Sequence, residues 1–237
     1  MSINPWPLTW ISHEKLLEIV RKLVEEGRPK TEGLSYNNIV DPFSAVFDMA
    51  VNQMNMEEWT KAEIRRQHQK TLQNAIGKFH QTVLGSVEGW EDKGVGNVFD
   101  LQCDSRKIFA EVKNKFNTVK GSDKIDIYNK MARWRGADPA HFEYTGYYVQ
   151  ILTKKPFDQY FVPSDNTTKN KAAENKHIRE IDGASFYALV TGSKTALHDL
   201  YRVLPHVLKE VIPEFQSDDV GQSEDFEKLF EQAFHEK

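Results

Sequence analysis

The chain has 237 residues, of which 39% are hydrophobic and 28% are charged. This composition is too apolar for wholesale disorder and too polar for a membrane protein. No stretch approaches the roughly 20 apolar residues of a membrane span, and no basic start precedes an apolar run at the N-terminus. We therefore expect a cytoplasmic protein. The single cysteine, Cys103, excludes a disulfide framework and a cysteine-based zinc site.

The net charge of −4 is unevenly distributed along the chain. Residues 106–135 hold nine Lys or Arg and three acidic residues, whereas residues 210–237 hold two basic and nine acidic residues. A local basic surface on an acidic protein is compatible with DNA binding, because attraction depends on the field at the groove. The alternative is a set of solvated helix faces, which is the more frequent cause of such runs.

The N-terminal third has the apolar spacing of helices. This spacing predicts a first helix that ends at Gly27, and the pair Asp41–Pro42 predicts the start of a second, with Asp41 as its cap. A third, longer helix is predicted over residues 57–84, with one break near Asn74 or Gly77.

The period then changes to that of mixed strands and helices. Strands are predicted over residues 95–103, 108–114, 144–152 and 181–191, and helices over 122–135, 195–211 and 223–235. Pro205 is expected to kink or divide the second of these helices. The order predicts an α/β fold, with a mixed central sheet flanked by helices and an N-terminal helical region. We expect one domain over 1–237, with a helical region (1–60), a core (61–212) and an acidic C-terminal helix (213–237).

The candidate chemistry lies on a predicted hairpin. Side chains alternate along a strand, so Glu111 and Lys113 share one face. If Ser105 and Arg106 form the tip of the turn, Asp100 lies directly opposite Glu111. Opposed like charges destabilise a sheet by up to about 1 kcal/mol, and a divalent cation between them reverses that sign. Two carboxylates offer the hard oxygens that Mg²⁺ prefers.

This arrangement resembles the PD-(D/E)XK nuclease superfamily, although Phe99 stands where the motif has proline. The resemblance implies that Asp100, Glu111 and the backbone carbonyl of Val112 hold Mg²⁺, with Mn²⁺ as an expected substitute. It implies a catalytic role for Lys113, whose ammonium can neutralise developing charge or orient the attacking water. Asp104 is an alternative metal ligand, although an aspartate at a turn usually serves the turn itself.

Further segments resemble type II restriction endonucleases that cut GGNCC or GGWCC. They are residues 38–43, 63–67, 74–81, 89–90 and 111–118, with weaker similarity over 181–192. The resemblance implies Mg²⁺-dependent, sequence-specific cleavage of double-stranded DNA by a homodimer at a short palindromic site, giving 5′-phosphate ends. It also implies a cognate DNA methyltransferase as a functional, not a physical, partner.

Several other residues are candidates for supporting roles. Glu63 and Gln81 are possible accessory residues of the site, although Glu63 is also placed for an ordinary helix-surface ion pair with Arg66. Basic and polar residues with the chemistry to contact phosphates or base edges are Lys115, Asn117, Thr118, Lys120, Arg65 and Arg66.

Three alternatives remain open from the sequence. One is a structure-specific or repair nuclease of the same fold, and another is a non-catalytic DNA-binding protein on a degenerate nuclease fold. The third is a soluble α/β domain whose acid–lysine pattern arose by chance, as short motifs often do.

Overall fold

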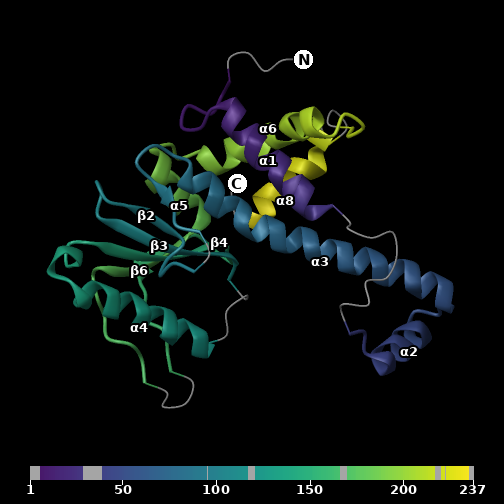
Figure 1. Cartoon of the computed structure of the whole chain (residues 1–237), viewed down its shortest axis with the longest axis horizontal. Coiled ribbons are helices and arrows are strands. Elements are labelled where there is room, and N and C mark those ends of the chain that lie inside the picture. The colour runs from purple at the N-terminus through teal and green to yellow at the C-terminus, as the bar shows by residue number, and fades with distance from the viewer. Residues whose placement is uncertain are drawn as a thin grey trace. The chain divides into compact units, whose positions relative to one another are not determined.

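The computed structural model describes residues 6–28, 39–94, 96–116, 121–165, 170–216, 220–221 and 223–234 (Figure 1). The chain forms two compact units, one of Met1–Val20 with Phe79–Lys237 and one of Arg21–Lys78. The expected single nuclease domain, with its internal boundaries at 60/61 and 212/213, stays a prediction. Within the described ranges no helix combines the length and apolarity needed to cross a membrane.

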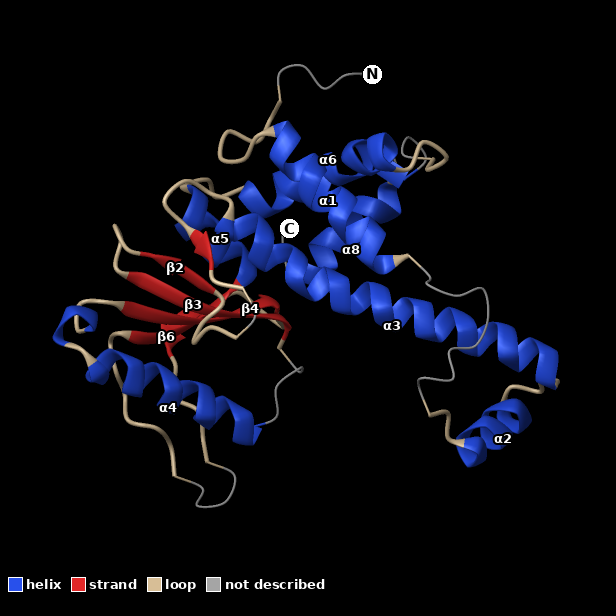
Figure 2. Ribbon diagram, in the orientation of Figure 1, coloured by secondary structure: helices blue, strands red, loops and turns tan. Residues whose placement is uncertain are grey.

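The larger unit contains one mixed six-stranded sheet, ordered β1-β2-β3-β4-β6-β5 (Figure 2). Its strands are β1 (Glu91–Asp92), β2 (Leu101–Cys103), β3 (Ile108–Lys115), β4 (Thr145–Leu152), β5 (Asp158–Tyr160) and β6 (Ile178–Asp182). The central strands β3, β4 and β6 are parallel, and the other pairs are antiparallel. Parallel neighbours bury a strand on both faces, which explains the nearly continuous apolar run of β4.

Helices cover both faces of this sheet. On one face α4 (Gly121–Ala137) contributes Met131 to a buried cluster with Phe109 and Tyr148 of the strands. On the other face α5 (Gly183–Thr191) places Phe186 5.9 Å from the ring of Tyr147. Figure 2 shows the two helices on opposite sides of the strands. The expected α/β fold with a mixed, helix-flanked sheet is confirmed.

Five further α-helices among the described residues agree closely with the sequence pattern. They are α1 (His13–Gly27), α2 (Pro42–Val51), α3 (Met56–Gly85), α6 (Ala196–Val211) and α8 (Glu224–Phe234). The short 3-10 helix η1 (Pro139–His141) was not predicted. Asp41 caps α2 as expected, its carboxylate accepting from the Phe43 amide. Two expected interruptions are wrong, because α3 runs through Asn74 and Gly77 and α6 through Pro205 without a break.

Two predicted strands are wrong in extent. The segment predicted as a strand over 181–191 is a strand only to Asp182, because the Asp182 carboxylate accepts from the Ser185 amide and caps α5. The strand predicted over 95–103 is reduced to Leu101–Cys103. Before it, Gly94 and Gly96 adopt φ values of 68° and 93°, which turn the chain instead of extending it.

Candidate active site

The hairpin of β2 and β3 has the register that the sequence predicts. Leu101 pairs with Ala110, Gln102 with Phe109 and Cys103 with Ile108. Cys103 is buried and free, as expected for an inert core residue. The turn between the strands places Lys107 at φ 54°. One step beyond the last assigned pair, this register brings Asp100 opposite Glu111.

Asp100 is fixed at the point where β2 begins. Its amide donates to the Ala110 carbonyl at 3.0 Å, and its Oδ2 accepts from the Val112 amide at 2.7 Å. The side chain thus takes the place of a backbone partner, and Oδ1 has no hydrogen bond within the described part of the chain. Because the N–H and C=O of one strand residue point to the same side, the Val112 carbonyl points toward this same edge.

Glu111 lies between two lysines. Its Oε1 is 2.8 Å from Nζ of Lys113, which lies on the same strand face, and its Oε2 is 3.6 Å from Nζ of Lys130 on α4. The Glu111 side chain is 12% exposed, whereas those of Lys113 and Lys130 are 31% and 39% exposed. The carboxylate is therefore mostly buried, whereas the side chains of the two lysines are partly exposed to solvent.

The surroundings of Asp100 disfavour its charge. Burial, and then the neighbouring Glu111 carboxylate, raise the pKa of Asp100 above its ordinary value. The Val112 amide, Lys113 and Lys130 act in the opposite direction but do not cancel this rise. A cation bound between the two carboxylates would offset their repulsion. The raised pKa of Asp100 therefore indicates a site that favours cation binding.

The donor chemistry fits a hard divalent cation. Asp100 and Glu111 supply carboxylate oxygens, and Mg²⁺ is commonly held in proteins by one or two carboxylates with several retained waters. Among the described residues no cluster of three or more His, Cys, Asp or Glu side chains has the arrangement of a metal site. A site here would therefore combine the two carboxylates with a backbone oxygen and water.

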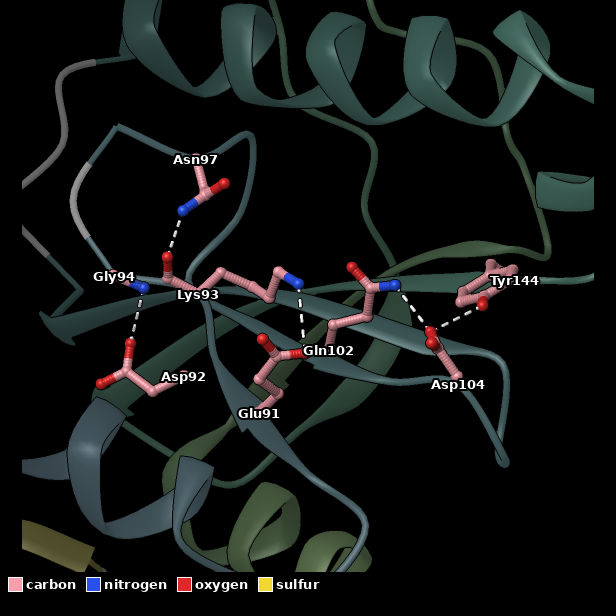
Figure 3. A network of polar contacts seen from close by, with 8 residues as sticks. All are labelled: Glu91, Asp92, Lys93, Gly94, Asn97, Gln102, Asp104 and Tyr144. Atoms are coloured by element: carbon pink, nitrogen blue, oxygen red, sulfur yellow. Dashed lines mark hydrogen bonds and ion pairs between the residues drawn. The ribbon is translucent and has the colours of Figure 1, made fainter.

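A polar network on the flank of the hairpin explains Asp104 (Figure 3). Its carboxylate accepts from Nε2 of Gln102 at 2.6 Å and from the Tyr144 hydroxyl at 2.8 Å. At the other side of Figure 3, the Asp92 carboxylate accepts from the Gly94 amide at 2.9 Å. Asp104 therefore stabilises the turn through Gln102 and Tyr144. Neither of these contacts involves Asp100 or Glu111.

The two accessory candidates, Gln81 and Glu63, each have other side-chain partners in the structure. Gln81 on α3 donates to Asp92 of β1 at 2.7 Å, so it braces the edge of the sheet. Glu63 belongs to the smaller unit, where Nε of Arg66 lies 2.6 Å from its carboxylate and Nε2 of Gln67 donates to it at 3.0 Å. The hydrogen bond from Arg66 lowers the pKa of Glu63. This is the helix ion pair that the sequence offered as the alternative.

The DNA-binding candidates are only partly described. Asn117, Thr118 and Lys120 lie outside the described residues. Lys115 ends β3 and lines a cavity of about 390 Å³ with Leu152 and Lys154, at the carboxyl ends of β3 and β4. Arg65 is exposed on α3, and Arg66 is bound to Glu63.

The structure adds two residues that the sequence analysis did not single out. Lys130 reaches Glu111 because the helix between parallel strands β3 and β4 packs back on the sheet. Tyr148 of β4 pairs with Glu111 of β3, and its fully buried hydroxyl has no hydrogen-bond partner among the described residues. Burial, Glu180 and Glu111 raise the pKa of this phenol. The strand–helix–strand order of this segment is the sequence feature that could have pointed to Lys130. For Tyr148 the sequence offers only its place in a predicted strand.

Comparison with known proteins finds restriction endonucleases that are similar to this chain. A model of the Eco47II restriction endonuclease family matches residues 8–213. The chain is 40% identical over 213 residues to the type II restriction enzyme Eco47II of Escherichia coli, covering 87% of this chain and 89% of the relative. It is 30% identical over 235 residues to the type II restriction enzyme Sau96I of Staphylococcus aureus, covering 95% and 89%.

These matches extend over the sheet, the hairpin and the helices on both of its faces. They favour a site-specific deoxyribonuclease over the alternatives that the sequence left open. With a family match over most of its length and two relatives at this level of identity, the chain belongs to the Eco47II restriction endonuclease family of type II restriction enzymes.

Proposed function

We propose that this chain hydrolyses double-stranded DNA at a short palindromic site through Asp100, Glu111 and Lys113. The observation that carries the proposal is the contact of the Asp100 carboxylate with the Val112 amide, next to Glu111, with Nζ of Lys113 2.8 Å from Glu111. Membership of the family gives the class of reaction, and the carboxylate pair is the proposed site of that reaction. Mg²⁺ is the proposed cofactor and Mn²⁺ the proposed substitute, held by Asp100, Glu111 and the Val112 carbonyl.

When bound, such a cation polarises a phosphodiester oxygen and lowers the pKa of a bound water. Hydrolysis adds the oxygen of water to phosphorus and breaks the bond to the 3′ oxygen. The products are a 5′-phosphate and a 3′-hydroxyl. Lys113 is proposed to face the attacked phosphate, where its ammonium offsets the negative charge that develops on the phosphoryl oxygens.

Cleavage of both strands of a palindromic DNA site implies further partners. We propose a homodimer, because a two-fold symmetric protein places one site against each strand of a palindrome. The proposed recognition sequence is GGNCC-like, and a methyltransferase of the same specificity would protect the host DNA. Lys115, Arg65 and Arg66 are the described candidates for DNA contacts; for Arg66 this requires release from Glu63.

The test is digestion of a sequenced plasmid by wild type and by Glu111→Ala, in Mg²⁺ and in EDTA. Discrete Mg²⁺-dependent fragments from wild type alone, with one sequence at every cut end, are the expected result. Cleavage by Glu111→Ala at the wild-type rate would sink the residue assignment. Cleavage of branched DNA without cleavage of the plasmid would replace the proposed substrate by a structural one.

A separate variant tests Lys113. Lys113→Ala is expected to bind duplex DNA within a fewfold of the wild-type affinity and to lose at least about a hundredfold in single-turnover rate, as loss of a group that stabilises transition-state charge commonly does. A variant that loses binding in proportion to its rate would assign Lys113 to DNA affinity instead.

A further inference from the structure

Lys130 is a second cation at the carboxylate pair. Its Nζ faces Oε2 of Glu111 at 3.6 Å, while Lys113 faces Oε1 at 2.8 Å, so each oxygen of Glu111 has its own ammonium group. Lys130 also comes from a different element, helix α4, whereas Lys113 shares a strand with Glu111. The two lysines therefore approach the carboxylate independently.

A second contact holds Lys130 at the site. Its Nζ lies 5.1 Å from the centre of the Phe99 ring, a distance at which an ammonium is attracted to the face of an aromatic ring. Phe99 is buried and packs edge-to-face against Trp134 of α4 at 5.7 Å, so the ring is fixed. This contact does not depend on Glu111, and it would keep the ammonium in place if that carboxylate took another partner.

The charges at the site are balanced in the free protein. Two carboxylates, Asp100 and Glu111, face two ammonium groups, Lys113 and Lys130. A divalent cation on the carboxylates would leave the ammonium groups without their partners and give the site a net positive charge. A DNA phosphate offsets part of this positive charge, and the 39% exposed side chain of Lys130 is accessible to it.

We propose that Lys130 is a phosphate-binding residue of the nuclease site: it neutralises Glu111 in the free protein and contacts a DNA phosphate when the carboxylates hold a divalent cation. This inference rests on the proposed function of Asp100 and Glu111. It predicts that cation and DNA each strengthen the binding of the other, since linkage of this kind is reciprocal.

The first test is the salt dependence of DNA binding. Affinity for a labelled duplex is measured by fluorescence anisotropy in Ca²⁺ over a series of NaCl concentrations, with a gel to verify that the duplex stays intact. Lys130→Met keeps the aliphatic stem over Phe99 and removes the charge. Its slope of log K against log[salt] is expected to be shallower than wild type by about 1, the effect of one lost phosphate contact.

Two variants control for charge and for fold. Lys130→Arg keeps a cation and is expected to keep the wild-type slope. Lys15→Met removes an exposed lysine of α1 that pairs only with Glu18 in the contacts seen here, and it should also keep the slope. Thermal unfolding of all three variants within a few degrees of wild type verifies that the fold is intact.

The second test is cation binding by the free protein, measured by calorimetry with Ca²⁺ alone. Lys130→Met is expected to bind Ca²⁺ about two- to fivefold more tightly than wild type, because the competing ion pair is lost. A wild-type salt slope in Lys130→Met would overturn the phosphate contact. Unchanged Ca²⁺ affinity would overturn the neutralising role.

Failure of this inference is distinguishable from failure of the proposed function. If wild type cleaves DNA in Mg²⁺ and Glu111→Ala does not, the carboxylate site stands and the slope decides Lys130 alone. If wild type does not cleave, or Glu111→Ala cleaves equally, the site assignment and the inference on Lys130 are both overturned.

Discussion

Asp100 is the residue at which stability and the proposed function conflict. Its carboxylate is partly buried and opposes Glu111, and both effects raise its pKa. A raised carboxyl pKa means that the folded chain binds a proton more readily than the unfolded chain. The contribution to stability therefore falls as pH rises through the shifted range, and the penalty is complete at neutral pH.

Asp100→Asn is expected to stabilise the metal-free protein by about 1 kcal/mol at pH 7.5, the order of a relieved like-charge opposition. Its amide oxygen still accepts from the Val112 amide, so the local geometry is kept. The same variant is expected to lose cleavage, because a carboxamide is a poor ligand for Mg²⁺. Chemical denaturation with EDTA present, and plasmid digestion, measure the two effects. Lower stability than wild type would contradict this description of the site.

Tyr148 permits a second prediction at a single hydroxyl group. The hydroxyl is fully buried without a partner among the described residues, and its ring stacks on Phe161 at 4.8 Å. Tyr148→Phe removes the hydroxyl and keeps the stack, so the free energy of unfolding should be unchanged or higher by up to about 1 kcal/mol. Urea denaturation measures it. A loss above about 1 kcal/mol would mean that the hydroxyl has a hydrogen-bond partner in solution.

At the scale of single residues, the sequence predicts the register that brings Asp100 opposite Glu111 and the place of Lys113, but not Lys130 or Tyr148. Alternation along two short strands is sufficient to oppose Asp100 and Glu111. The contacts of Lys130 and Tyr148 with that pair depend on which helix covers the face and on the neighbouring strand, and both are long-range facts. The interpretation of Asp104 as a turn residue also holds, because its partners, Gln102 and the Tyr144 hydroxyl, support the turn.

At the scale of elements, the helices were easier to predict than the strands. Caps and stop residues such as Asp41 and Gly27 act locally, so their effect is legible in sequence. The apolar run after Asp182 predicts a strand, but it forms α5, a helix that is buried on its sheet-facing side and whose length is within the range of either element. The cap from Asp182 decides between them, and only glycine fits at the next position, because a Cβ on Gly183 would lie 2.6 Å from the Ile151 carbonyl oxygen.

The carboxylate of Asp182 stabilises the start of α5 and the segment before β5, and its removal tests that role. One oxygen caps α5 through the Ser185 amide at 3.0 Å, and the other accepts from the Phe157 amide at 2.9 Å. Asp182→Ala is expected to destabilise the protein by about 2 to 3 kcal/mol, since it removes a cap and leaves a second amide unpaired. Asp182→Asn, which keeps one acceptor, should lose less. Equal stability of the alanine variant and wild type would contradict the capping role.

At the scale of the whole molecule, a partly buried histidine links stability to pH. Burial lowers the pKa of His80 to about 4, and its Nδ1 lies 2.9 Å from the Tyr187 hydroxyl. Above about pH 6.5 the imidazole is neutral in both folded and unfolded chains. As pH falls from 6.5 toward 4, only the unfolded chain takes up the proton, so stability falls by up to about 3 kcal/mol.

The matched variant is His80→Asn, which keeps a polar group near Tyr187 and cannot titrate. Its overall stability will be lower than that of wild type, but the decline in unfolding free energy between pH 7 and pH 5 should be smaller. Denaturant titrations of both proteins at four or five pH values measure the difference in slope. Parallel curves would assign the acid sensitivity to other groups.

The fold class and the family can be predicted from the sequence, whereas the bounds of the two compact units cannot. Element order predicted a mixed sheet between helices, and the structure has one. The division into two compact units at residues 20/21 and 78/79 falls inside α1 and inside α3, where no change of composition marks it. Periodicity along a helix is the same on either side of such a boundary, so the pattern cannot reveal it.

The measurement that tests the central claim most directly is single-turnover cleavage of one defined duplex by wild type and Glu111→Gln, with DNA binding in Ca²⁺ measured in parallel. We predict that Glu111→Gln remains folded, still binds the duplex and loses at least about a thousandfold in rate, the scale of losing an essential electrostatic group. A Glu111→Gln variant that cleaves within tenfold of the wild-type rate would contradict the account.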